Sequence, residues 1–151
     1  MADFTTTDEI LDFAIRNEQN AVDLYTDLAE KTKSAAAKAE FISFANEERG
    51  HRIKLEKVKS GRKLIGLDAK VQDLKIADYS VDVVLGDNPD YQNILLFAMK
   101  QEKAAFRLYS DLANMTPDAE IKTLLLDLAQ EEAKHKLKFE IEYDDNVLQE
   151  N

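Results

Sequence analysis

The chain has 151 residues, a formal net charge of -10 and no cysteine. Its length suits one domain with a single hydrophobic core. The negative charge argues against nucleic acid or an anionic membrane surface as a partner. The absence of cysteine excludes disulfides, cysteine-ligated zinc and iron–sulfur centres in this chain. The N-terminal sequence lacks the pattern of a signal peptide, and the longest apolar run, ILLFAM, is too short to cross a bilayer. We therefore expect a cytoplasmic location.

The first half of the chain predicts two helices. A capping box that begins at Thr6 precedes an apolar stripe and predicts a helix over about residues 7–31. Either Thr32 or Ser34 can cap a second helix, because both side chains accept hydrogen bonds from backbone N–H groups. This second helix is expected to end near residue 59.

The second half predicts two more helices after a connector. Residues 60–89 hold three of the four glycines, and their partial alternation leaves a short strand or a helical turn open. Asn88–Pro89 or Asp90 is expected to start the third helix. Thr116–Pro117 predicts a cap followed by a proline at the first position of the fourth helix. This helix is expected to fray near Asp144, where the sequence becomes acidic.

The chain contains an internal repeat. The segment Ile10–Glu56 aligns without a gap on Ile94–Glu140, so that ILDFAIRNEQNAVDLYTDLAE reads against ILLFAMKQEKAAFRLYSDLAN. The same offset carries three potential metal ligands of the first copy onto the second copy. The matched pairs are Glu18 with Glu102, Glu48 with Glu132, and His51 with His135, the only histidines in the chain.

The lengths of the connections predict the topology. Short turns within each repeat make its two helices antiparallel. A helix of about 25 residues is roughly 37 Å long, and the connector at 60–89 is long enough to return over that distance. We therefore expect one all-α domain over residues 1–151, with repeat units of about 7–59 and 90–144. Its architecture would be a ferritin-like four-helix bundle with one long crossover between helices two and three.

Each predicted helix places one glutamate on an otherwise apolar seam. The seam of the first helix follows steps of three and four: Leu11, Ala14, Glu18, Ala21, Tyr25 and Leu28. This spacing is typical of residues that face the interior of a bundle. Burying even one unpaired carboxylate costs several kcal/mol, and four together would also repel one another. No lysine or arginine lies on the seams, so two divalent cations are the predicted counter-charges.

The spacing of the polar seam residues predicts how they bind metal. In the second and fourth helices, a glutamate and a histidine three residues apart share one face and can give one ion an oxygen and a nitrogen. The glutamates of the first and third helices would be terminal or bridging ligands. Mixed oxygen and nitrogen ligation suits iron, with manganese as a possibility. The predicted metal ligands are Glu18, Glu48, His51, Glu102, Glu132 and His135.

Several neighbours of these ligands allow two interpretations. Tyr25 and Tyr109 lie seven residues after the glutamates of their helices, on the same face. They are expected to fill the core, and a hydrogen bond from each hydroxyl to a metal-binding glutamate across the bundle is an open alternative. Glu47 and Glu131 are one residue from a ligand, which turns a side chain by about 100° on a helix. We interpret them as flank residues, with metal entry or support of a ligand as the alternative.

The chain resembles the rubrerythrins and related ferritin-like di-iron proteins over about residues 7–143. The resemblance rests on the conjunction of Glu18, Glu48-x-x-His51, Glu102 and Glu132-x-x-His135. Two departures stand out. Rubrerythrin proper has a further glutamate three residues after the third-helix ligand, where this chain has Ala105. It also carries a cysteine-ligated rubredoxin domain, for which this chain has no cysteine.

The resemblance implies a homodimer with two iron ions per chain and an oxidoreductase function. In this hypothesis the six ligands are also the catalytic residues, and hydrogen peroxide or dioxygen is reduced. Electrons come from an external electron-donor protein, because the chain has no second redox centre. Two alternatives remain open. One is a ferroxidase or iron-binding and storage protein, and the other is a non-redox helical interaction module that retains a metal.

Overall fold

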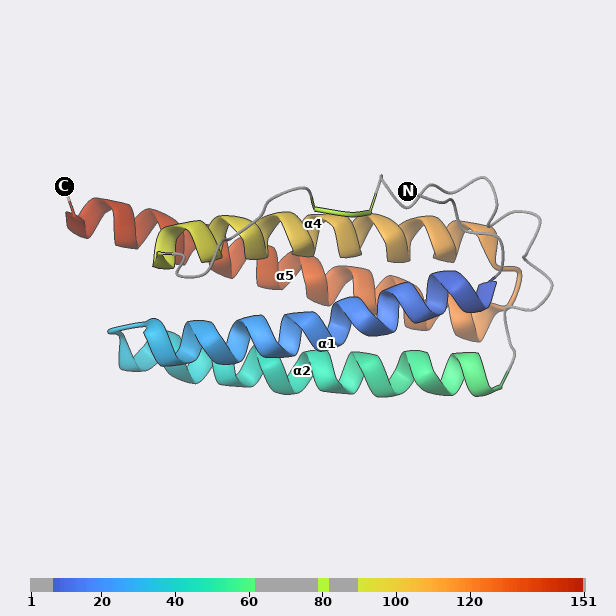
Figure 1. The fold of residues 1–151 in the computed structure, drawn as a ribbon. Coiled ribbons are helices and arrows are strands. Elements are labelled where there is room, and N and C mark those ends of the chain that lie inside the picture. Colours follow the sequence, from blue (N-terminus) through green and yellow to red (C-terminus); the bar gives the residue numbers. More distant parts are fainter. Residues whose placement is uncertain (1–6, 62–78, 82–89, 151) are drawn as a thin grey trace.

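The computed structural model describes residues 7–61, 79–81 and 90–150 (Figure 1). Its helices are α1 (Thr7–Lys31), α2 (Ala35–Ser60), α4 (Tyr91–Met115) and α5 (Ala119–Glu150). The helices α1 and α2 pack as one hairpin, and α4 and α5 pack as a second hairpin. Figure 1 shows α2 and α4 running in the same direction, so the end of α2 and the start of α4 lie at opposite ends of the bundle. The predicted all-α bundle with one long crossover is confirmed.

Local capping explains where two of the helices begin. Ser34 has an extended backbone, and its hydroxyl accepts the N–H of Ala37 at the start of α2. Asp90 accepts the N–H of Asn93 in the same way at the start of α4. Both residues were among the predicted caps. The capping box predicted at Thr6 lies outside the described residues.

The predicted limits of the last helix are wrong at both ends. Asp118, and not Thr116–Pro117, caps α5, because its carboxylate accepts two N–H groups of the first turn. Thr116 instead ends α4 with an extended backbone. The helix also continues past Asp144 to Glu150. The sequence beyond Phe139 contains neither glycine nor proline, so no residue there breaks the backbone hydrogen bonds of a helix.

Apolar side chains pack in two clusters, and the buried polar residues lie between them. One cluster joins the start of α1, the end of α2, the end of α4 and the start of α5, and it includes Ile10, Leu55, Leu112 and Leu125. The other cluster fills the opposite end with Leu28, Phe41, Leu95 and Phe139. Close packing at both ends holds the four helices at fixed separations. The side chains in the middle of the bundle are therefore held in place before any ligand binds.

Only a short part of the connector is described. Tyr79 packs in the first apolar cluster, and its hydroxyl donates a hydrogen bond to Asp111 of α4 at 2.5 Å. Residues 79–81 have no regular secondary structure, and the rest of the predicted strand or helical turn lies outside the described residues. Among the described helices, none is long and apolar enough to cross a membrane.

Candidate metal centre

The six predicted ligands converge in the middle of the bundle, and each is no more than 2% exposed. They form two groups, and within each group the ligand atoms lie within 4.8 Å of one another. The first group consists of Glu18, Glu48, His51 and Glu132. The second group consists of Glu48, Glu102, Glu132 and His135. The geometry therefore brings all six residues together, while their binding of metal stays a prediction.

Two glutamates belong to both groups, and these are the carboxylates that could contact both ions if two ions bind. Glu48 and Glu132 are the shared carboxylates, whereas Glu18 and Glu102 belong to one group each. The Nδ1 atom of each histidine also lies closest to the shared glutamate of the opposite hairpin. The Nδ1 atom of His51 is 2.8 Å from Glu132 Oε1 but 3.8 Å from Glu48 Oε2. Both groups are thus built across the two hairpins, which sequence spacing could not indicate.

The inward atoms of these side chains lack hydrogen-bond partners among the described residues. They are Glu18 Oε2, Glu48 Oε1, Glu102 Oε2, Glu132 Oε1 and the Nδ1 atoms of both histidines. The short distances between Nδ1 atoms and carboxylates bring the atoms close without the angles of a hydrogen bond. Leaving buried polar atoms unpaired is costly. A cation within each group would satisfy these atoms, and the mixed oxygen and nitrogen donors fit iron or manganese.

Without a cation, the cluster holds protons. Burial and the charge of Glu132 raise the pKa values of Glu48 and Glu102 well above the usual range. Burial alone would also raise the pKa of Glu132, but its close contacts with Glu102 and with His51 outweigh burial and lower that pKa to about 2. For His51, burial opposes the charged form, but contacts with the carboxylates dominate and raise its pKa. Metal binding at neutral pH must therefore release protons.

A further carboxylate contacts the outer nitrogen of each histidine. The Nε2 atom of His51 pairs with Glu131, and that of His135 pairs with Glu47, each from the opposite hairpin. A carboxylate at Nε2 keeps a proton on that atom, so the proton that a cation would displace is the one on Nδ1. Both glutamates lie partly exposed on the flanks of their helices, as predicted, and their contacts with the histidines favour the alternative that they also support the predicted ligands. The Glu-Glu-x-x-His motif present in both repeats was the available sequence indication.

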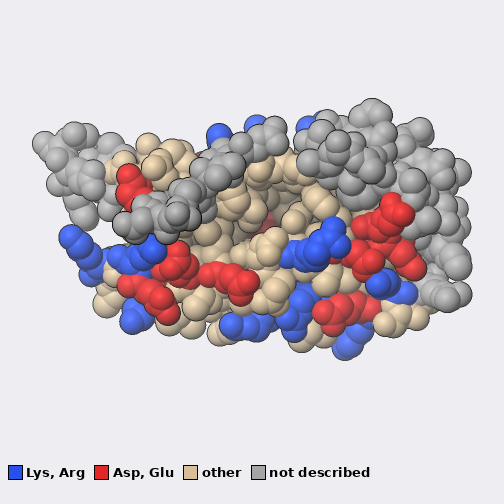
Figure 2. Space-filling model, viewed as in Figure 1, with Lys and Arg blue, Asp and Glu red and all other residues tan. Residues whose placement is uncertain are grey.

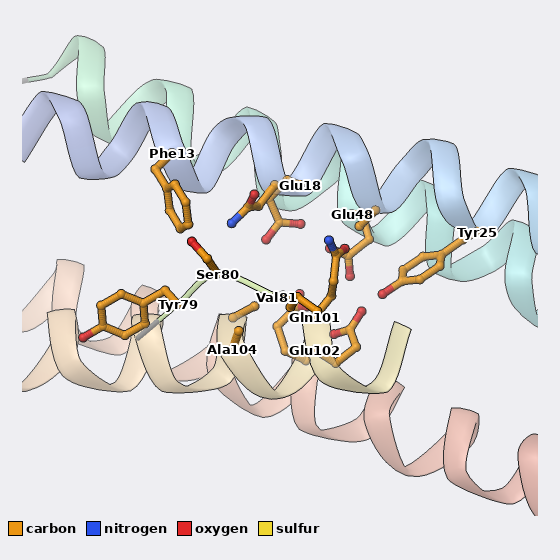
Figure 3. Close-up of a pocket in the computed structure, with 14 residues that line it drawn as sticks. Phe13, Glu18, Tyr25, Glu48, Tyr79, Ser80, Val81, Gln101, Glu102 and Ala104 are labelled. Atoms are coloured by element: carbon orange, nitrogen blue, oxygen red, sulfur yellow. The ribbon is translucent and has the colours of Figure 1, made fainter. Parts of the chain in front are cut away.

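The two tyrosines near the site differ in their hydrogen bonds. The Tyr109 hydroxyl donates to Glu18 across the bundle, which confirms the alternative interpretation for this residue. Burial and the charge of Glu18 raise the pKa of Tyr109. Tyr25 is also fully buried and packs on Phe139, but its hydroxyl has no hydrogen-bond partner among the described residues. In Figure 3 this hydroxyl points toward Glu102.

A cavity of about 180 Å³ between α1 and α4 reaches the carboxylates. All four site glutamates line it, together with Tyr25 and the small side chains Ala21 and Ala105, while neither histidine does. Phe13 and residues 79–81 also line the cavity. Figure 2 shows this hollow with an acidic side chain deep inside it. This cavity therefore gives small molecules access to the carboxylate side of the cluster.

The fold and the site define a ferritin-like bundle with a paired cluster of carboxylates and imidazoles. The sequence model of the rubrerythrin family matches residues 9–143. The chain therefore belongs to the rubrerythrin family, which is typified by di-iron carboxylate proteins. A search of curated proteins and a search of solved structures found no match.

Proposed function

We propose that this protein is a di-iron oxidoreductase that reduces hydrogen peroxide or dioxygen with electrons from a separate donor protein. The supporting observation is that Glu48 and Glu132 belong to both ligand groups. Two shared carboxylates favour two adjacent ions over two isolated ones. When bound, two ferrous ions would supply one electron each, as the cleavage of peroxide to two water molecules requires, with two protons taken up.

The cavity supports a small substrate. Its volume of about 180 Å³ is below the roughly 300–1,000 Å³ of pockets that hold larger organic ligands. Phe13 and residues 79–81 contribute to its wall, and they limit the entry of larger molecules. Tyr25 places an unpaired hydroxyl at the cavity, where it can donate a hydrogen bond to a bound oxygen atom. The hydroxyl of Tyr109 is already engaged by Glu18.

The sequence supports an external source of electrons. With no cysteine, the chain cannot hold an iron–sulfur centre. Both histidines of the chain are already part of the candidate metal site. A donor protein would therefore have to deliver its electrons through the wall of the bundle.

The function can be tested with protein loaded anaerobically with Fe(II). We expect two irons per chain, oxidation by about one peroxide per two irons, and repeated peroxide consumption only when an electron donor is present. Zinc-loaded protein is the matched control, because zinc occupies such sites without redox chemistry. Retention of many ferric ions per chain after repeated additions of Fe(II) in air would instead indicate storage. Bound iron that neither peroxide nor dioxygen oxidises would indicate a non-redox module.

A further inference from the structure

An apolar hollow lies on the outer face of the second hairpin, away from the substrate cavity. It has a volume of about 350 Å³ and is lined by Lys103, Phe106, Ala133, Lys136, Leu137 and Glu140. Phe106 is 41% exposed and Leu137 is 56% exposed. An exposed aromatic and an exposed aliphatic side chain with a charged rim are typical of the centre of a protein–protein interface.

The rim of this hollow is basic, although the chain has a net charge of -10. Lys100, Lys103 and Arg107 lie three and four residues apart on α4 and share one exposed face. None of these three has an acidic partner among the described residues. Glu140 is the one acidic residue that lines the hollow, and Lys136 pairs with it at 2.5 Å. The hollow therefore presents unpaired positive charge around an apolar centre.

The internal repeat supplies a comparison within the same molecule. The positions on the first hairpin that match Lys103, Phe106 and Leu137 are Gln19, Val22 and Ile53. Val22 is only 3% exposed, in contrast to Phe106. The first hairpin therefore lacks the aromatic side chain that forms part of the hollow on the second.

Polar contacts also cover the matching face of the first hairpin. Arg52 donates to Gln19 across α1 and α2, and it pairs with Glu56 at 3.2 Å. Asp23 stands where the second hairpin has Arg107, so the row on α1 mixes charges. Basic and acidic side chains are likewise mixed on the lower part of Figure 2, where α1 and α2 lie. The first hairpin has the same fold and the matching ligands without a basic hollow. Neither the fold nor the metal site therefore requires the hollow on the second hairpin.

The hollow lies on the outer side of the metal site. Lys103 is next to Glu102 on α4, and Ala133 is next to Glu132 on α5. A helix with its side chains is about 10–12 Å across, so the floor of the hollow is separated from these ligands by about one helix. The substrate cavity opens instead between α1 and α4. Substrate and electrons could thus reach the site from different faces.

The charge distribution discriminates between possible occupants. In a two-fold symmetric pair of chains, each hollow would face its own copy. The unpaired cations at Lys100, Lys103 and Arg107 would then repel one another. A long nucleic acid would be repelled by the rest of this acidic chain. A small protein with an acidic patch fits both the positive rim and the limited area. The homodimer expected from the resemblance stays a prediction and would use another face.

We propose that the α4–α5 hollow is the docking site for a small acidic protein that carries one electron at a time. This proposal rests on the proposed function and adds the place of electron entry. Two successive carriers, each oxidised by one electron, would replace the two electrons that one peroxide consumes. Complementary charge should speed their association and make it sensitive to salt.

The test uses iron-loaded protein that has been oxidised with peroxide. Its reduction is followed by stopped-flow absorbance, with either a reduced plant-type [2Fe–2S] ferredoxin as the acidic carrier or dithionite as a small reductant. The test variant is Lys100→Glu/Lys103→Glu. Its matched control is Arg16→Glu/Arg49→Glu, which makes the same change of charge on the outer face of the first hairpin.

We expect the test variant to lower the ferredoxin rate constant at low salt at least tenfold and to abolish most of its salt dependence. The control should stay within about twofold of the parent, and dithionite should reduce all proteins equally. A second pair of variants tests the apolar centre. Leu137→Ala should lower the rate constant for reduction by ferredoxin, whereas the matched Ile53→Ala should leave it unchanged.

Two outcomes would overturn the docking site. One is an equal loss of ferredoxin rate in both charge variants, and the other is no loss in either. If the test variant changed the sedimentation of the chain but not its reduction by ferredoxin, the hollow would be an interface with a second copy, contrary to the proposal. Failure of dithionite to reduce the protein, or of peroxide to oxidise it, would instead refute the proposed function.

Discussion

At the scale of single residues, the sharing of Glu48 and Glu132 predicts unequal effects of similar substitutions. Glu48→Gln keeps the size of the side chain but removes its charge and one metal-binding oxygen. Because Glu48 belongs to both groups, this variant should weaken the binding of both ions. Glu18→Gln should weaken mainly one ion. Metal titration by calorimetry, with elemental analysis after dialysis, should leave under one ion on the first variant and about one on the second. Equal losses in the two variants would contradict the bridging assignment.

The carboxylates outside the histidines predict a second effect. Glu131→Gln should weaken metal binding by about 10- to 100-fold, because the amide orients the His51 ring less strongly and lowers its basicity. Competition with a chelator at fixed pH would measure this change. Glu30→Gln, at an exposed position on α1, is the control and should bind as the parent does. An unchanged affinity in Glu131→Gln would show that the contact with His51 has no role in metal binding.

The six predicted ligands could be found from the sequence because each helix places them on a regular seam. Their division into shared and terminal residues could not be found, since it depends on how one hairpin is rotated against the other. The contacts of Glu47 and Glu131 with the histidines were only an alternative in the sequence analysis, for a related reason. A turn of about 100° moves a side chain off the seam, but on a helix with two neighbours it then faces the adjacent helix. There each glutamate contacts the outer nitrogen atom, Nε2, of His51 or His135.

At the scale of the helix, Gly50 is a point of weakness in α2. A Cβ atom added there would meet no atom within 4 Å, and glycine inside a helix costs about 1 kcal/mol relative to alanine. Gly50→Ala should therefore raise the free energy of unfolding by up to about 1 kcal/mol without changing metal content. Urea unfolding of the metal-free protein would measure this. The matched exchange Lys134→Gly, at the equivalent position of α5, should be destabilising by a similar amount. A lower free energy of unfolding in Gly50→Ala would mean that the added methyl group disturbs a contact with a part of the chain outside the described residues.

The limits of the helices were predictable where a single polar residue could act as the cap. Ser34 and Asp90 are such cases. The start of α5 was not, because Thr116–Pro117 and Asp118 offer competing caps within three residues. Asp118 prevails in the structure because its carboxylate accepts two N–H groups. The hydroxyl of Thr116 instead accepts the N–H of Asp118, before the helix begins.

At the scale of the whole molecule, the protonated cluster predicts how stability depends on pH. The pKa values of Glu48, Glu102 and His51 are higher in the folded protein than their ordinary values. The contribution of these bound protons to the free energy of unfolding is complete below the ordinary carboxyl pKa of 4.5. It is lost as the pH rises through the pKa values of the folded protein. The low pKa of Glu132 affects the stability only in more acidic solution, below the ordinary carboxyl pKa. The melting temperature of the metal-free protein should therefore fall between about pH 5 and 8.

Metal should reverse this dependence, because cations compete with the same protons. At a free metal concentration of about 100 times Kd, the gain is about 2.7 kcal/mol, or roughly 5–10 °C for a chain of this size. The gain should grow from about pH 5 to 8. Differential scanning fluorimetry with and without Mn(II) at each pH would measure both trends. A metal-free melting temperature that rises over this range would contradict the assigned pKa directions.

Removing two of the carboxylates tests the cost of their burial. In Glu18→Leu/Glu102→Leu, two buried polar groups become apolar, so the metal-free protein should be more stable than the metal-free parent. The same variant should no longer bind a pair of ions or gain stability from metal. Urea unfolding with and without Mn(II) would measure both effects. A less stable metal-free variant would show that hydrogen bonds such as that from Tyr109 to Glu18 outweigh the repulsion.

Each ligand group takes three side chains from one hairpin and only one from the other. Two identical hairpins related by a two-fold axis would therefore supply both groups in full. The arrangement is the one expected of an ancestral gene for a single hairpin, whose product paired with itself before duplication joined the copies. After fusion, the sequences of the two halves could also diverge from each other. Once they shared one chain, Val22 could stay buried on one hairpin while Phe106 became exposed on the other.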